Sequence, residues 1–195
     1  MSSVDTLIAI ITARLQLEDG PVIVGIDGRS GAGKSTLAEQ LGASLPRAVI
    51  EGDDFYAGGS GEQWDAMTPA ERAAHCIDWR RQVLVLTSLR AGRAVQWHPY
   101  DWEAFDGSLS SVVVRCDPAD VVVLEGVYSC RPELRGLVDV CALVHVPESQ
   151  RLQQLRSREG DGYRSEWESR WSSAEGFYFA SVMAPELFDV VIGPD

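Results

Sequence analysis

One short segment has the glycine spacing and the lysine of a phosphate-binding loop. Gly28-Arg29-Ser30-Gly31-Ala32-Gly33-Lys34-Ser35 matches G-x-x-x-x-G-K-[ST] at every fixed position, and Thr36 follows it. Glycines let the backbone wrap around phosphates with successive N–H groups pointing inward, and the N-terminus of a following helix adds positive charge. Lys34 can contact the β- and γ-phosphates, and the Ser35 hydroxyl can coordinate Mg²⁺. We therefore predict that residues 28–36 bind a nucleoside triphosphate; the alternative is a chance glycine turn.

Carboxylates follow two other apolar runs. Asp53 and Asp54 lie in EGDDFY, residues 51–56, and Glu125 lies in DVVVLEGVY, residues 120–128. Ligands of open α/β sheets bind at the carboxyl ends of the strands, so these side chains are expected near the glycine loop. Asp53, or failing it Asp54, could orient or deprotonate a hydroxyl that attacks the γ-phosphate, and Glu125 could bind Mg²⁺. The alternatives are an Asp-Asp cap or turn and a buried strand that ends at a Glu-Gly turn.

A third segment is rich in arginine although the chain is acidic. Residues 151–164, RLQQLRSREGDGYR, contain Arg151, Arg156, Arg158 and Arg164. Arginines on a mobile lid can stabilise a phosphoryl group in transit. On its own, however, the segment favours a solvated helix face with paired charges.

The elements that must position these groups alternate between strand and helix. Barely alternating apolar runs predict parallel strands covered on both faces, at 22–26, 48–51, 121–125, 140–146 and 190–192. Helical patterns fall at 3–17, 34–45, 69–90, 148–158 and 165–182. We predict an α/β fold of the P-loop NTPase type, a doubly wound five-stranded parallel sheet with helices on both faces. Residues 1–195 are expected to form a single domain with an N-terminal helix within 1–20, a mobile loop at 57–68, a hairpin insertion at 92–116 and an arginine lid at 151–164.

Composition excludes several classes of function. The formal net charge of −12 argues against nucleic acid and anionic membranes as partners. The four cysteines form no C-x-x-C pair, which disfavours zinc and suits a reduced, cytoplasmic compartment. The N-terminal run VDTLIAIITARLQL lacks the basic start of a signal peptide and is too short to span a bilayer. No N-K-x-D or L-S-G-G-Q segment occurs, which leaves small-molecule kinases as the leading class.

Together these residues resemble the uridine kinase-like branch of P-loop kinases, which includes nicotinamide riboside kinases and, more distantly, phosphoribulokinase and pantothenate kinase. The resemblance runs from about Val22 to Pro194. It rests on GRSGAGKST, DDFY, YDW at 100–102, PADVVVLEG at 118–126, the arginine segment and the closing FDVVIGP. Only the first of these motifs is specific alone.

The resemblance implies Mg-ATP-dependent phosphoryl transfer to a primary hydroxyl of a small-molecule acceptor. It assigns Asp53 as the base, Arg156 and Arg158 as lid arginines, and Glu125 as the acidic metal partner beside Ser35. Tyr56 and Tyr100 match positions that line the acceptor pocket of the family, and Asp53, Asp78 and Trp102 are further candidates for contact with the acceptor. The molecule could also be a homo-oligomer.

The sequence departs from uridine and cytidine kinases at the base-reading positions. Phe105 and Gly107 stand where those enzymes have a His and an Arg, and no FDHP stretch occurs near residues 69–75. Asp78 and Trp79 could take over some acceptor contacts. A nucleoside-like acceptor is therefore the first hypothesis. A non-nucleoside alcohol, or a regulatory protein that binds ATP without transferring phosphate, is the alternative.

Tryptophan is frequent near the expected acceptor site. Trp64, Trp79, Trp97 and Trp102 fall in that region, and Trp167 and Trp171 share one helix face through their i,i+4 spacing. They could form an aromatic cage for a ring-bearing acceptor, or they could be core residues.

Overall fold

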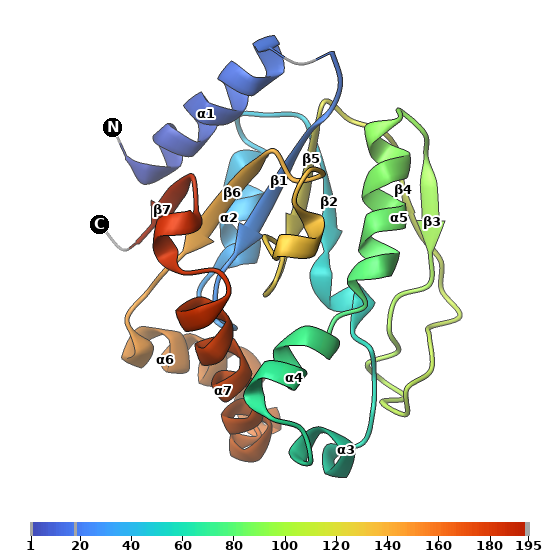
Figure 1. Cartoon of the computed structure of the whole chain (residues 1–195), viewed down its shortest axis with the longest axis vertical. Helices are drawn as coiled ribbons and strands as arrows, with labels where there is room; N and C mark the ends of the chain where they lie inside the picture. The colour runs from blue at the N-terminus through green and yellow to red at the C-terminus, as the bar shows by residue number, and fades with distance from the viewer. Residues whose placement is uncertain (1, 18, 194–195) are drawn as a thin grey trace.

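A parallel sheet of five strands forms the centre of the computed structural model (Figure 1). The structure describes residues 2–17 and 19–193, so Met1, Glu18, Pro194 and Asp195 of the predicted domain lie outside the described residues. The strands follow the order β2-β5-β1-β6-β7. Their bounds are β1 Val22–Asp27, β2 Arg47–Glu51, β5 Val121–Glu125, β6 Val140–Val144 and β7 Val190–Ile192. The predicted five-stranded parallel sheet is confirmed, although β6 ends two residues early.

Two hydrophobic cores lie on opposite faces of this sheet. Successive side chains of a strand point to opposite faces, so a fully apolar strand contributes to both cores. Val22 and Val24 pack with helices α1 (Ser3–Leu17) and α2 (Lys34–Leu41). Ile23 and Leu124 belong to the other core, which also contains residues of α5 (Trp79–Arg90) and α7 (Ser165–Ser181). The unbroken apolar runs in the sequence reflect this double covering.

The predicted helix at 69–90 is wrong as a single element, because the structure divides it into α4 (Pro69–His75) and α5. Between them the chain runs alongside residues 55–57. The Asp78 amide donates to the Phe55 carbonyl at 2.8 Å, and Ile77 forms a β-bridge with Tyr56. The Asp78 carboxylate then accepts from the Arg81 amide and caps α5. An acidic residue in a helical pattern thus marks a new start.

The glycine-rich segment at 57–68 contains a short helix, so the prediction of a loop throughout is wrong. Helix α3 (Gly61–Asp65) begins at Ser60, whose hydroxyl and backbone pair reciprocally with Gln63. Thr68 and Glu71 form the same capping box at α4. Both S/T-x-x-E/Q patterns are helix-start signals that the glycines obscured.

Residues 92–116 include an antiparallel strand pair. β3 (Val95–Trp97) pairs with β4 (Val114–Cys116), and Trp97 lies opposite Val114. This pair stands beside α5 (Figure 1). The remaining elements complete the fold: α6 Glu148–Glu159 and the 3-10 helices Gly52–Phe55, Pro132–Leu134, Gly160–Gly162 and Pro185–Leu187.

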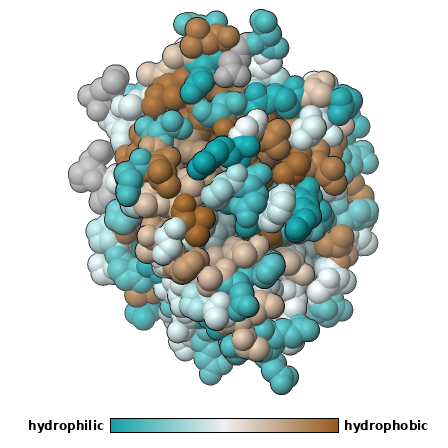
Figure 2. All heavy atoms as spheres, viewed as in Figure 1, coloured by the Kyte–Doolittle hydropathy of each residue, from teal (hydrophilic) through white to brown (hydrophobic). Residues whose placement is uncertain are grey.

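The surface seen in Figure 2 mixes apolar and hydrophilic side chains without one large apolar patch. In the described part of the chain, no helix combines the length and apolar character needed to cross a bilayer.

Candidate active site

The functional segments meet because three neighbouring strands end at the same level. Ile26 of β1 pairs with Glu125 of β5, which in turn pairs with Glu51 of β2. The loops that follow these strands therefore leave the sheet side by side. A Cβ added to Gly52 would lie 3.0 Å from the Glu125 carbonyl oxygen, which is closer than most Cβ contacts, so the two loops pack tightly at this glycine. The contact brings the loop that carries Asp53 against the loop that follows Glu125.

The glycine loop borders a cavity of about 610 Å³. Gly33 adopts a positive φ of 100°, and α2 begins at the next residue. Lys34 is largely buried, and its Nζ donates to the Arg29 carbonyl at 3.2 Å. The predicted nucleotide-binding residues that line this cavity are Ser30, Gly31, Ala32, Gly33, Lys34, Ser35 and Thr36. The loop and the helix terminus thus form a cradle, with N–H groups and a lysine that could hold an anion.

The other two predicted nucleotide-binding residues have different positions. The Gly28 amide donates to the Asp27 carboxylate at 2.8 Å. The Arg29 side chain turns away from the cradle and binds Glu148 at 2.7 Å and Glu175 at 3.4 Å. Neither residue is among those that line the cavity. Arg29 contacts Lys34 through its carbonyl, whereas its side chain pairs with acids outside the cavity.

Ser35 and Glu125 lie together at the edge of the cradle. The Ser35 hydroxyl donates to Glu125 Oε1 at 3.0 Å. Burial raises the pKa of Glu125, whereas the nearby Lys34 charge and the Ser35 hydrogen bond lower it. Among the described residues no cluster of three or more His, Cys, Asp or Glu side chains could hold a metal alone. Two protein oxygens suit Mg²⁺, which usually keeps water and phosphate oxygens as its other ligands.

The two adjacent aspartates have separate environments. Asp53 lines both the cradle cavity and a second, neighbouring cavity. Asp54 instead accepts a 2.7 Å hydrogen bond from Trp97 Nε1 of the hairpin, and burial raises its pKa. Asp53 is therefore the aspartate that faces both spaces.

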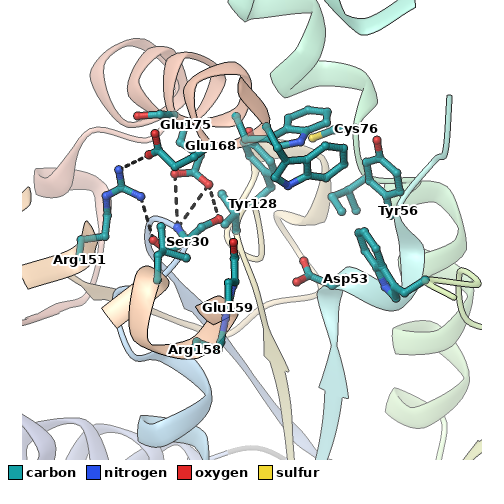
Figure 3. A pocket seen from close by; sticks show the side chains of 17 residues that line it. Ser30, Asp53, Tyr56, Cys76, Tyr128, Arg151, Arg158, Glu159, Glu168 and Glu175 are labelled. Atoms are coloured by element: carbon teal, nitrogen blue, oxygen red, sulfur yellow. Dashed lines mark hydrogen bonds and ion pairs between the residues drawn. The ribbon is translucent and has the colours of Figure 1, made fainter. Parts of the chain in front are cut away.

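The second cavity is smaller, about 320 Å³, and has aromatic walls (Figure 3). The Tyr56 and Trp102 rings stack with centroids 5.1 Å apart and an interplanar angle of 25°. The ring centroids of Trp167 and Trp171, both on α7, lie 5.4 Å apart. This volume is near the lower end of the ~300–1,000 Å³ typical of small-molecule sites.

Several polar atoms in these walls make no hydrogen bond of ordinary geometry with the described residues. They include the hydroxyls of Tyr56 and Tyr128 and the indole N–H of Trp171, all buried. Burial raises the pKa of Tyr56, so its hydroxyl stays protonated and can donate. Trp64 lies near the Tyr56 hydroxyl and Cys76 near the Tyr128 hydroxyl, and a partly polar ligand could complete the hydrogen bonding of these groups.

The structure separates the aromatic residues that the sequence grouped together. Trp102, Trp167 and Trp171 line the aromatic cavity, whereas Trp64 and Trp97 are buried in the core. Tyr100 is also buried; its ring meets the Tyr56 ring edge-on at 4.9 Å and supports it. Asp78 and Trp79 line a different cavity that does not include Asp53.

The arginine segment forms α6 and the turn after it, and its members play different parts. Arg158 lines both cavities. Arg156 lines neither of them and stacks on the Tyr163 ring at 5.5 Å. Arg151 is almost fully buried and binds the Ser30 carbonyl at 3.1 Å and Glu168 at 2.6 Å. In this arrangement Arg158, rather than Arg156, faces the site.

Two buried acids near the loop were missed in the sequence. Asp27 accepts from the amides of Gly28, Tyr128 and Cys130 and from the Tyr178 hydroxyl, at 2.8–3.0 Å. In the sequence, the feature that could have pointed to Asp27 is its position as a charged residue at the end of an apolar strand. Glu175 of α7 accepts from Ser30 and Arg29, and no local pattern pointed to it.

The strand order β2-β5-β1-β6-β7, with the glycine loop after β1, gives the chain a fold that solved kinase structures share. A possible uridine kinase from Bacillus stearothermophilus superposes with a TM-score of 0.69, over 97% of each chain, at 23% sequence identity. A comparison with models of known protein families finds no match.

The chain is also similar in sequence to curated uridine kinases. It is 30% identical to the uridine kinase of Limosilactobacillus reuteri (strain DSM 20016) over 148 residues, 71% of this chain. It is also 30% identical to the uridine kinase of Brevibacillus brevis over 142 residues, 68% of this chain. The matched regions span 65% and 63% of the lengths of these two relatives.

Proposed function

We propose that this protein is an ATP- and Mg²⁺-dependent kinase that transfers the γ-phosphoryl group to a hydroxyl of a small, nucleoside-like acceptor. The position of Asp53, in the wall of both cavities, is the observation that carries the proposal. A nucleotide in the cradle and an acceptor in the aromatic cavity would meet at this carboxylate. Phosphoryl transfer requires such an in-line approach of the acceptor oxygen to the γ-phosphate.

Each group then has a defined part. The loop amides and Lys34 hold the phosphates, and Ser35 and Glu125 hold Mg²⁺. A bound Mg²⁺ neutralises charge on the phosphate oxygens. Asp53 orients the acceptor hydroxyl and accepts its proton. Arg158, which faces both cavities, stabilises the charge on the transferred group.

The walls of the second cavity support an acceptor that has a flat ring and carries no phosphate or other anionic group of its own. Its aromatic faces suit stacking, and its unpaired hydroxyl and indole groups suit a polar ring edge. Of the two lining arginines, Arg151 is buried and pairs with Glu168, and Arg158 is assigned here to the transferred phosphoryl group. No other cation lines this cavity in the described part of the chain, so a sugar phosphate would lack a charge partner.

The remaining hypotheses are a kinase of a non-nucleoside alcohol and an ATP-binding regulatory protein. A binding module needs a cradle but has no use for a carboxylate placed between two cavities. A ring-free alcohol would leave the aromatic walls unused.

The test is ATP turnover with Mg²⁺ across a panel of nucleosides, sugars and vitamins, followed by mass spectrometry of the product. We expect ADP formation to be stimulated by ring-bearing alcohols and to stop when Mg²⁺ is chelated. Stimulation by ring-free alcohols alone would favour the first alternative. Nucleotide binding without turnover on any acceptor would favour the regulatory protein.

A further inference from the structure

Ser30, at the tip of the glycine loop, is held from two sides. The Ser30 amide and hydroxyl donate to the carboxylate of Glu175 on α7. The Ser30 carbonyl accepts from Arg151 on α6 at 3.1 Å. Figure 3 shows both sets of bonds meeting at Ser30. Ser30 lines the cradle as well as the aromatic cavity, so a shift of this residue changes the walls of both.

The carboxylate that holds Ser30 shares a helix face with the aromatic walls. Trp167, Trp171 and Glu175 follow one another at intervals of four residues on α7, which places them on one side of the helix. All three line the aromatic cavity. A rigid helix thus connects the rings at the acceptor end to the loop at the phosphate end.

Helix α6 fixes the loop tip from its other side. A Cβ on Gly31 would lie 2.9 Å from the Arg151 carbonyl oxygen and 2.6 Å from the Leu155 side chain, so the loop packs directly on this helix. Arg151 also binds Glu168 of α7 at 2.6 Å. The two helices and the loop tip are therefore joined in one closed set of contacts.

Glu175 does not compete with a nucleotide in this arrangement. It is 2% exposed and lines the aromatic cavity, but it is not among the residues that line the cradle. Glu175 Oε2 also lies 3.4 Å from Arg29 Nε. Arg29 in turn contacts Ser172 and Glu148, so helices α7 and α6 both hold this part of the loop. The carboxylate supports the loop from behind.

We propose that Glu175 is a positioning residue that couples the aromatic cavity to the phosphate loop, so that acceptor and nucleotide each tighten the binding of the other. This inference rests on the proposed function, because it assigns the two cavities to the two substrates. Packing of an acceptor against Trp167 and Trp171 fixes α7, and Glu175 then fixes Ser30. Coupling between two sites is reciprocal and commonly amounts to ~5–150-fold in affinity.

The first experiment needs no acceptor. Calorimetry with Mg-ADP and with a non-hydrolysable Mg-ATP analogue compares the unmodified chain with Glu175→Gln, whose amide can no longer accept from all its donors. We expect about 10-fold weaker nucleotide binding in the variant. In parallel, saturating nucleotide should change the tryptophan fluorescence of the unmodified chain, with Trp171→Phe as the assignment control, and this change should be lost in Glu175→Gln.

The matched control is Glu166→Gln, an exposed glutamate on the same helix. It should keep both the affinity and the fluorescence response. If Glu175→Gln fails to fold by circular dichroism, Glu175→Asp provides the same readouts, because it keeps the charge but draws it back from Ser30.

The second experiment measures the coupling itself. With an acceptor from the panel, nucleotide affinity should rise at least about 5-fold in the unmodified chain and Glu166→Gln, but not in Glu175→Gln. Unchanged nucleotide affinity and response in Glu175→Gln would overturn the inference while leaving the kinase proposal intact. Tighter nucleotide binding would show that Glu175 blocks the loop, which also overturns it. No nucleotide binding by the unmodified chain would remove the proposed function and the inference with it.

Discussion

At the scale of single residues, position relative to the strand end separates two chemically identical neighbours. Asp53 faces both cavities, whereas Asp54 is engaged by the Trp97 indole. The DD pair was visible in the sequence, and Asp53 was its first candidate. Which side chain faces which way depends on the 3-10 turn at 52–55 and on the hairpin, neither of which a local pattern specifies.

The first prediction concerns these aspartates. Asp53→Asn should lower kcat by about 10²-fold or more, because a positioned base contributes that much, while binding of a non-hydrolysable ATP analogue stays nearly unchanged. Asp54→Asn is the control, since its amide oxygen can still accept from Trp97, and it should retain most activity. Steady-state kinetics and calorimetry measure the two effects. Full activity of Asp53→Asn would remove the base assignment.

The second prediction concerns the aromatic cavity. Trp102→Leu should raise the acceptor KM by about 10-fold with little change in the KM for ATP, since stacking on an aromatic ring is worth ~1–3 kcal/mol per base. Trp79→Leu changes the same residue type outside this cavity and should leave the acceptor KM unchanged. Equal effects of the two substitutions would argue against a cage that includes Trp102.

At the scale of elements, Asp27 ties the end of β1 to the segment after β5 and to α7. It is fully buried, and its four donors come from these separate parts of the chain. The sequence predicted the strands well because each strand is a continuous apolar run. It could not reveal which buried acid joins them, since the partners Cys130 and Tyr178 are 103 and 151 residues away.

The third prediction follows from this junction. Asp27→Asn should lower the free energy of unfolding at neutral pH by about 1–3 kcal/mol, because the amide nitrogen cannot accept from the amides that face it. Burial raises the pKa of Asp27 above 3.8, so the native carboxyl keeps its proton at pH values where the unfolded one has lost it. Stability therefore falls as the pH rises from 3.8 through the raised pKa, and the variant lacks this slope. Urea unfolding at several pH values measures both effects.

The control for that experiment is Asp117→Asn, because Asp117 is exposed. It should change the free energy of unfolding by no more than about 0.5 kcal/mol. If Asp27→Asn lowers the free energy of unfolding no more than this control is expected to, the Asp27 hydrogen bonds contribute little to stability.

Helix boundaries were less predictable than strands. The pattern at 69–90 is helical throughout, and only tertiary pairing of residues 76–78 with 55–57 divides it. The two predicted lid arginines have different positions for a related reason. Arg156 and Arg158 are two residues apart, and on a helix such neighbours point in different directions. The order of strand, glycine loop and helix was predictable, since the loop has its own glycines and follows a continuous apolar run.

At the scale of the whole molecule, the hairpin and the main sheet share one hydrophobic core. Trp97 and Cys116 of the hairpin belong to the same cluster as Ile23 and Leu124 of the sheet. The parts that bear the site are therefore not independent of one another, and a ligand that bridges several loops should stabilise the molecule as a unit.

The fourth prediction tests this unity. Thermal unfolding should show a single transition, and Mg-nucleotide at about 100 times its Kd should raise the Tm by about 5–10 °C. This follows from ~2.7 kcal/mol of ligand stabilisation and ~2–4 °C per kcal/mol for a chain of this size. Lys34→Ala should remove most of the shift. Two transitions, or a shift that survives in Lys34→Ala, would contradict the prediction. Differential scanning calorimetry provides the measurement.

Ser30, Asp53, Val127 and Arg158 each line both cavities, so the two spaces share a wall. This adjacency has a consequence for inhibitor design. A compound that tethers a ring-bearing head to an adenosine through a phosphate chain would fill both spaces after a single association step. The second half would then bind at the high effective concentration set by its short linker.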